Sequence, residues 1–352
     1  MRRFNVDGAR GLSCVVVALL SCTAGFVQAG TIKSEEYDYW HLQKAEESEY
    51  EAVGRLRMVS TDGSRFIGSG TLIGRRWVLT AAHCVAGMKS IKFTVGGETY
   101  KGKNWFSHTR YDTTQVPGDG FDIALVQLEK PVPKGISPAK LALHHPSEGD
   151  KITIVGYGST GTGLTGNVLP AGTKRAGDNI LDQYYQRNRY NRRILQYDFD
   201  WDPFAFGGLA ADDFLPADSP DDFALALEYC AAQGDSGGAL FQAGRVVGIT
   251  SFGTSGSFFG THAGSVNVAV FRKWINQVKR KVVRGKSLDG LADRGSARNP
   301  LPDLALIGGS TTVGSEELYH FLYRINAIPE PTSLALLSLG ALGLLRRRRQ
   351  VA

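Results

Sequence analysis

The pentapeptide Gly234-Asp235-Ser236-Gly237-Gly238 is the last of three short strings that together decide how this chain folds. It is preceded by Thr80-Ala81-Ala82-His83-Cys84 and by Asp122-Ile123-Ala124-Leu125. Taken singly, the strings have ordinary structural explanations: a buried core histidine, an aspartate in a turn and a flexible glycine loop. Taken together, they supply a hydroxyl nucleophile, an imidazole base and an orienting carboxylate. Acyl transfer needs this set, because a serine hydroxyl is a poor nucleophile near neutral pH.

The order His, Asp, Ser and its surroundings resemble the trypsin-like serine proteases of the chymotrypsin fold. Residues 68–73 and 77–79 resemble that family's approach to its histidine, residues 155–158 the start of its second barrel, and residues 251–253 the strand that binds substrate backbone. The resemblance covers roughly residues 53–283. It implies an all-β fold of two antiparallel Greek-key β-barrels with the active site in the cleft between them, plus a C-terminal helix.

Carried over residue by residue, the resemblance implies Ser236 as nucleophile, His83 as general acid-base and Asp122 as orienting carboxylate. The oxyanion hole would be formed by the backbone N–H groups of Gly234 and Ser236, and the glycines around Ser236 allow the tight turn that this requires. No cofactor and no metal are expected. The substrate-binding residues implied are Cys230, Gln233, Ser251, Phe252 and Gly253.

The pattern of apolar residues independently favours a turn-rich, mostly β chain. Glycine supplies 43 of 352 residues without a three-residue period, and short apolar runs alternate with Gly, Asp and Pro, as is typical of strands. The first barrel is expected at about 53–150, the second at about 151–270, and an amphipathic helix at 271–283. The predicted strands are residues 52–59, 66–73, 77–82, 91–95, 123–128, 152–156, 239–241, 245–251 and 266–270.

Two cysteines depart from the family pattern. The partner usual for a cysteine after the histidine would stand 16 positions before Cys84, where this chain has Gly68. Cys230 stands six residues before Ser236, where the resemblance implies the floor of the primary specificity pocket, a position that is acidic in family members that cut after Arg or Lys. We therefore expect two free, largely buried thiols. Without a fixed negative charge at the floor, a small or apolar substrate side chain is favoured over a basic one.

Asp235 poses a further question. In the family this aspartate pairs with a new N-terminal ammonium after zymogen cleavage, yet no Ile-Val-Gly-Gly-like start occurs between Gly30 and Val53. Either a processed N-terminus in that segment or another cation compensates Asp235.

The N-terminus has the pattern of a secretory signal peptide at residues 1–29. Three arginines precede an apolar stretch, which closes with Val27-Gln28-Ala29 before Gly30. The alternatives are a buried N-terminal helix, a retained membrane anchor, and a lipoprotein signal with Cys22 acylated. Residues 30–52 are polar without a sustained period, and we expect an irregular lead-in.

The C-terminus resembles the PEP-CTERM sorting tail of Gram-negative bacteria over residues 329–352. Pro329-Glu330-Pro331 precedes an apolar run at 334–345 and four arginines at 346–349. A 12-residue helix spans only about 18 Å, short for a bilayer core of about 30 Å, which suits transient anchoring in the inner membrane. The resemblance implies that a sorting transpeptidase cuts near Pro-Glu-Pro and that the protein reaches the cell envelope or exterior. The alternative is a core helix with a basic tail; residues 284–328 are expected to be a linker.

The two end segments account for most of the net charge. The whole chain has 40 Lys and Arg against 34 Asp and Glu, a net +6. Removing both ends takes away seven basic and two acidic residues and leaves 33 against 32, about +1. Nucleic-acid binding therefore loses its electrostatic support.

A long decorated loop is predicted between the strand that ends at residue 156 and the strand that begins at residue 239. Residues 174–193 are rich in arginine and residues 198–222 in aspartate. Asp198-x-Asp200-x-Asp202 resembles the opening of a calcium loop, but Leu209 stands where the closing acidic residue is expected. A solvated acidic loop is the favoured interpretation. His144-His145 lacks further ligands at metal spacing and is expected at the surface.

These observations favour an exported serine endopeptidase acting on protein or peptide substrates. Two alternatives stay open. One is a catalytically silent, trypsin-like binding or adhesion module at the cell envelope, whose usual mark is a replaced triad residue. The other is an esterase that uses the same three residues.

Overall fold

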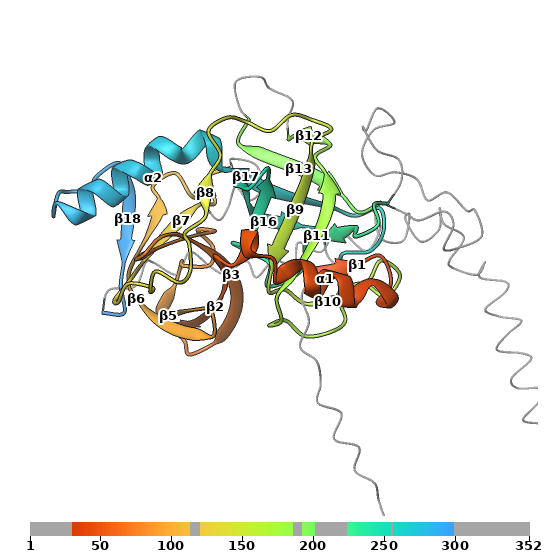
Figure 1. The fold of residues 1–352 in the computed structure, drawn as a ribbon. Coiled ribbons are helices and arrows are strands. Elements are labelled where there is room, and N and C mark those ends of the chain that lie inside the picture. The colour runs from red at the N-terminus through yellow and green to blue at the C-terminus, as the bar shows by residue number, and fades with distance from the viewer. Residues whose placement is uncertain (1–29, 113–119, 186–191, 201–223, 255, 299–352) are drawn as a thin grey trace, which may run out of the picture.

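The structure is a computed structural model, and it describes residues 30–112, 120–185, 192–200, 224–254 and 256–298. The predicted signal peptide, the sorting tail and most of the predicted acidic loop lie outside these residues. Figure 1 shows two β-modules side by side, with α1 across one of them and α2 on the other side of the molecule. The expected all-β fold of two barrel-like sheets with a C-terminal helix is confirmed.

The first barrel is a closed ring of six antiparallel strands. Neighbours pair in the order β5, β2, β3, β4, β7, and β6 pairs with both β5 and β7, which closes the ring. Its interior is filled by fully buried apolar side chains such as Leu56, Leu72 and Phe93. The strands are β2 (Val53–Ser60), β3 (Arg65–Gly74), β4 (Trp77–Thr80), β5 (Met88–Val95), β6 (Glu98–His108) and β7 (Ala124–Leu128).

The second module is an eight-stranded sheet with the path β11-β9-β15-β16-β17-β13-β12, and β8 pairs with β16. Its strands are β8 (Lys140–Leu141), β9 (Lys151–Gly156), β11 (Arg175–Ile180), β12 (Gln183–Tyr184), β13 (Ile194–Asp198), β15 (Ala239–Gln242), β16 (Arg245–Gly253) and β17 (His262–Asn267). Parts of the predicted decorated loop are thus strands β11, β12 and β13. The prediction was wrong there because the basic side chains obscured short buried runs such as residues 194–197.

The C-terminal helix α2 (Val268–Val283) begins earlier than predicted. The side chain of Asn267 accepts a hydrogen bond from the backbone N–H of Ala269 and so caps the helix. The strand expected over residues 266–270 therefore ends at Asn267. The apolar face predicted for this helix is buried, including Phe271, Trp274 and Ile275.

Residues 30–52, predicted to be an irregular lead-in, are ordered into defined elements. β1 (Gly30–Ile32) is the central strand of a small sheet with β10 (Thr160–Thr162) and β14 (Tyr229–Cys230). The helix α1 (Asp38–Ala45) packs against β11, flanked by the 3₁₀ turns Glu35–Tyr37 and Ser48–Tyr50. Helix α1 could not be predicted from the sequence because it buries only His41 and Ala45 and is held mainly by polar contacts. It therefore lacks the periodic apolar residues that mark an amphipathic helix.

The predicted linker also begins with folded structure. After α2 the chain turns back and forms β18 (Ala292–Gly295), which pairs antiparallel with β6 at the edge of the first barrel. The indole N–H of Trp274 donates to the carbonyl of Leu291 at 2.6 Å and ties this return to the helix. The short strand carries Asp293 and Arg294 outward, so it has no apolar run that marks it in the sequence.

Within the described residues, no helix combines the length and the apolar character that crossing a membrane requires.

Candidate active site

The pairing of β4 with β7 brings two of the predicted triad residues together. Thr80, the last residue of β4, is opposite Ala124, the first residue of β7. His83 lies in the turn that follows β4, and Asp122 lies two residues before β7. Because the strands are antiparallel, both residues emerge at the same end of the barrel. Positions 39 apart in sequence therefore meet.

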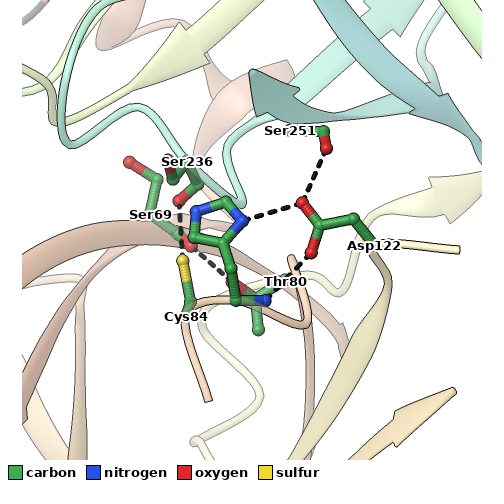
Figure 2. Close-up of polar contacts among 7 residues, drawn as sticks. Ser69, Thr80, Cys84, Asp122, Ser236 and Ser251 are labelled. Carbon is green, nitrogen blue, oxygen red and sulfur yellow. Dashed lines mark hydrogen bonds and ion pairs between the residues drawn. The ribbon is translucent and has the colours of Figure 1, made fainter. Parts of the chain in front are cut away.

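The Asp122 carboxylate is held by three donors. His83 donates to it twice, from the backbone N–H to Oδ1 at 2.9 Å and from the ring Nδ1 to Oδ2 at 2.7 Å. The Ser251 hydroxyl, on β16 of the second module, donates to Oδ2 at 2.6 Å. Figure 2 shows Ser251 and the imidazole converging on the same carboxylate. Asp122 thus joins the two modules at their boundary.

The ion pair determines the protonation of both partners. Burial by itself favours neutral His83, but the neighbouring Asp122 carboxylate outweighs it and raises the pKa of His83 well above its usual value of 6.5. Burial likewise opposes ionisation of Asp122, and the charge and hydrogen bonds of His83, together with Ser251, lower the pKa of that carboxyl below its usual value. With Nδ1 donating to Asp122, Nε2 is the ring nitrogen left to accept a proton.

Ser236 lies in a glycine turn that leads into β15. Gly234 and Gly237 have φ of 99° and 81°, in the left-handed region that favours glycine. A Cβ on Gly237 would lie 2.0 Å from Thr80 Oγ1 and 2.4 Å from the carbonyl of Ser69, so no other residue fits there. The turn is therefore pressed against the end of β4, next to the turn that carries His83.

Backbone contacts fix Ser236 beside the histidine turn. Its carbonyl accepts from the backbone N–H of Ser69 at 2.8 Å and from the thiol of Cys84, the neighbour of His83, at 3.5 Å. In Figure 2, Ser236 lies on the side of the imidazole away from Asp122. Among the hydrogen bonds of the described residues, none joins Ser236 to His83. The structure thus joins His83 to Asp122 directly and brings Ser236 to the same place through its backbone.

Two backbone N–H groups of the glycine turn are left without an acceptor in the described part of the chain. The N–H groups of Asp235, Gly237 and Gly238 donate to backbone carbonyls within the fold. Those of Gly234 and Ser236 donate to none. These two are the groups predicted to form the oxyanion hole, and a ligand oxygen is the kind of acceptor that satisfies them.

Ser69 organises this region, and sequence reasoning gave it no role. Its hydroxyl donates to the carbonyl of Gly234 and accepts from the N–H of Tyr157, both at 2.9 Å, and its carbonyl accepts from Thr80 Oγ1, also at 2.9 Å. One side chain on the first barrel thereby holds the glycine turn and the end of β9. Ser69 lies within the stretch quoted for the family resemblance, but these contacts span 88 and 165 positions, and no local pattern reports them.

The predicted substrate-binding residues have different surroundings. Cys230 is 1% exposed and belongs to an apolar cluster in the second module. Gln233 and Gly253 are exposed. The hydroxyl of Ser251 is engaged by Asp122, and the ring of Phe252 lies where a Cβ on Gly264 would be, 2.1 Å away.

The cysteine prediction is confirmed. Cys84 and Cys230 are both free and buried. Burial raises the pKa of the Cys230 thiol, so it stays protonated and uncharged at neutral pH. His144 and His145 are exposed as expected, and within the described residues no three His, Cys, Asp or Glu side chains gather as metal ligands.

Comparison with known proteins identifies two parts of the chain. The sequence model of the Trypsin family matches residues 44–203 and 221–275. The PEP-CTERM protein-sorting motif matches residues 327–349.

The chain is similar to curated proteins that are named trypsin, chymotrypsin or kallikrein. Trypsin epsilon of Drosophila erecta is 28% identical over 231 residues, which cover 62% of this chain and 80% of that protein. Chymotrypsin of Phaedon cochleariae is 30% identical over 203 residues, 53% of this chain and 63% of that protein. Human kallikrein-8 is 28% identical over 231 residues, which cover 61% of this chain and 78% of that protein. Among solved structures, neuropsin, a serine protease expressed in the limbic system of mouse brain, aligns with a TM-score of 0.47 at 19% identity and covers 66% of this chain and 96% of its own.

Proposed function

Because the chain belongs to the trypsin family of serine endopeptidases, we propose that it hydrolyses peptide bonds through an acyl-enzyme formed on Ser236. His83 is the general acid-base and Asp122 the carboxylate that orients it. The observation that carries this assignment is the 2.7 Å hydrogen bond from His83 Nδ1 to Asp122 Oδ2. It fixes the tautomer in which Nε2 accepts the proton of an attacking hydroxyl.

Each step uses groups of this site. As Ser236 Oγ bonds to the substrate carbonyl carbon, its proton passes to His83 Nε2, and the carbonyl oxygen becomes an oxyanion. The free N–H groups of Gly234 and Ser236 are the donors for that charge. His83 then gives its proton to the leaving amine as the C–N bond breaks. Water, deprotonated by the same imidazole, releases the acid and restores the hydroxyl.

The nucleophile is tested with a fluorophosphonate that phosphonylates activated serines. The wild-type protein should be labelled and should cleave peptides. Ser236→Ala should lose the label, and its kcat should fall by about 10⁶-fold, as expected when a triad nucleophile is removed. Ser159→Ala is a matched control, because its hydroxyl lies in the segment after β9 and donates to the carbonyl of Gln233, close to Ser236 in the chain. A folded wild type that stays unlabelled would favour the binding-module alternative.

We further propose that the substrate residue before the cleaved bond is small or apolar. Cys230, which the family resemblance puts at the pocket floor, stays uncharged, and Ala231 and Ala263 share its apolar cluster. A basic substrate side chain would be desolvated there without a partner at this position. Cleavage of a mixed peptide library tests this, and preferential cutting after Arg or Lys would contradict it.

Export completes the proposed function. The PEP-CTERM motif at 327–349 indicates sorting to the envelope of a Gram-negative bacterium. We propose that signal peptidase removes residues 1–29, that the tail anchors the chain transiently in the inner membrane, and that a sorting transpeptidase then cuts near Pro329. Intact-mass measurement of the mature protein tests both ends, and an acylated Cys22 would overturn the first.

A further inference from the structure

Asp235 holds together the turn that presents the two free N–H groups. Its carboxylate is fully buried. Oδ1 accepts from the N–H of Gly158 at 2.7 Å, and Oδ2 accepts from the N–H of Ala232 at 2.9 Å and from the hydroxyl of Tyr229 at 3.3 Å. Burial raises the pKa of Asp235 to about 6, and these donors act against that shift by favouring the ionised form.

Of these three donors to Asp235, only Tyr229 donates from its side chain. Its ring packs closely against two glycines, where no other residue would fit. It is fully buried. A Cβ on Gly30 would lie 1.8 Å from the ring of Tyr229, and a Cβ on Gly177 would lie 2.3 Å from the Cβ of Tyr229. The ring centroid of His41 is 5.9 Å away, and Ile32 of β1 is its register partner. The ring is thus enclosed on one side by residues that precede the first barrel.

Those residues are fixed to the second module by charged contacts. We call residues 30–45 the N-terminal segment. Asp38 on α1 accepts two hydrogen bonds from the guanidinium of Arg175, at 2.6 and 2.9 Å, and Arg175 is 1% exposed. Lys44 pairs with Asp178 at 2.9 Å. Bidentate pairs of this kind set geometry as well as attraction. The N-terminal segment therefore forms a rigid wall behind Tyr229.

We propose that Tyr229 is a positioning residue for the reaction: its hydroxyl holds the Asp235 carboxylate, and through it the turn that presents the N–H groups of Gly234 and Ser236. The N-terminal segment holds the ring of Tyr229 in place. This inference rests on the proposed function of Ser236. In this arrangement the turn does not require the α-ammonium of a processed N-terminus, which is the question that Asp235 raises in the sequence.

The first test is Tyr229→Phe, which removes the hydroxyl and keeps the ring. Because the oxyanion forms only after the bound substrate is attacked, kcat per titrated active site should fall about 10- to 100-fold while KM stays within about threefold. Tyr197→Phe is the matched control, since Tyr197 is equally buried in the same cluster and does not hydrogen-bond to Asp235. A loss of stability alone would lower the number of titratable sites and leave kcat per site unchanged.

The second test displaces Tyr229 while keeping its hydroxyl, because a Cβ on Gly30 would lie 1.8 Å from Tyr229 Cζ and 1.9 Å from its hydroxyl oxygen. Gly30→Ala, made in a chain that begins at residue 30, should displace Tyr229 and lower kcat per site by about 10- to 100-fold. Gly63→Ala is its control, because Gly63 also has a left-handed φ of 97° and has nothing within 4 Å of a new Cβ. If Gly30→Ala kept the wild-type kcat, the role of the N-terminal segment would be refuted.

The third test asks whether a free terminus is needed. A chain that retains Gln28 and Ala29 ahead of Gly30 should have the same kcat per site as a chain that begins at Gly30. If kcat per site were 100-fold or more lower in the longer chain, Asp235 would need an ion pair with the α-ammonium of Gly30, and the proposal would be overturned. The failures are distinguishable: an unlabelled wild type overturns the function of Ser236, whereas a labelled wild type with an equally active Tyr229→Phe variant overturns only the role of Tyr229.

Discussion

The ion pair between His83 and Asp122 sets the pH range in which the site can work. His83 must be neutral to accept a proton, and Asp122 raises its pKa well above 6.5. Activity should therefore appear as pH rises through that elevated value, with the acid limb of kcat/KM above pH 6.5. In Asp122→Asn the attraction for the imidazolium is gone, so the limb should move to lower pH while kcat falls about 10⁴-fold.

A pH profile of kcat/KM for both proteins measures this shift. Asp289→Asn is the control, because Asp289 is exposed in the turn between α2 and β18. If the acid limb of kcat/KM lay at the same pH in wild type and Asp122→Asn, the Asp122 carboxylate would not stabilise the protonated form of His83.

Ser251 supports the same carboxylate from the second module. Removing its hydroxyl in Ser251→Ala takes away a 2.6 Å hydrogen bond to Asp122. Hydrogen bonds to charged groups contribute about 1.5 to 3 kcal/mol, so kcat/KM should fall about 10- to 100-fold. Steady-state kinetics of Ser251→Ala and Ser265→Ala tests this. Ser265 is also buried and its hydroxyl has no hydrogen-bond partner in the described residues, so a comparable loss in that variant would contradict the explanation.

The residues proposed to carry out the chemistry could be predicted from the sequence, and the residues that hold them in place could not. His83, Asp122 and Ser236 each lie in a short string whose neighbours have a physical reason to be there. Ser69 lies in one of the stretches that carry the family resemblance and Tyr229 does not, but the pattern gives a role to neither, because their contacts are with residues that only the folded chain brings near. A buried serine and a buried tyrosine look like any others in the sequence.

The strands with apolar runs were predicted to within a few residues, whereas elements held by polar contacts were missed. Strand β6 (Glu98–His108) begins with six exposed or half-buried residues and so lacks an apolar run there. Helix α1 is held by Arg175 and Asp178, which lie more than 130 positions away in the sequence. Burial of apolar surface leaves a periodic signature in sequence, but an ion pair between distant residues leaves none.

Strand β18 should contribute to stability and not to catalysis. Ala292 is 6% exposed in the first barrel's core cluster, so Ala292→Asp places a carboxylate in an apolar site. The free energy of unfolding should fall by about 2 kcal/mol or more, with kcat per site unchanged. Asp293→Ala, on the exposed side of the same strand, should stay within about 0.5 kcal/mol of wild type. Denaturant unfolding measures both, and equal stabilities would mean that β18 does not pack as described.

The whole molecule divides its tasks between its two modules. The first barrel supplies His83 and Asp122 from the ends of β4 and β7, and the second supplies Ser236 and Ser251 around β15 and β16. The boundary is bridged by Ser69, Cys84 and Asp122 through hydrogen bonds to residues of the other module. The proposed mechanism therefore requires the two modules to pack together, and it predicts that Ser236 and His83 act as one unit.

A double-mutant cycle on His83 and Ser236 tests most directly whether these two residues act as one catalytic unit. kcat/KM for peptide hydrolysis is measured for wild type, His83→Ala, Ser236→Ala and the double variant, with folding checked by circular dichroism. If the imidazole acts only through the Ser236 hydroxyl, removing both should cost about as much as removing either one, a loss on the order of 10⁶-fold. Losses that multiply in the double variant, or a His83→Ala protein as active as wild type, would contradict the account.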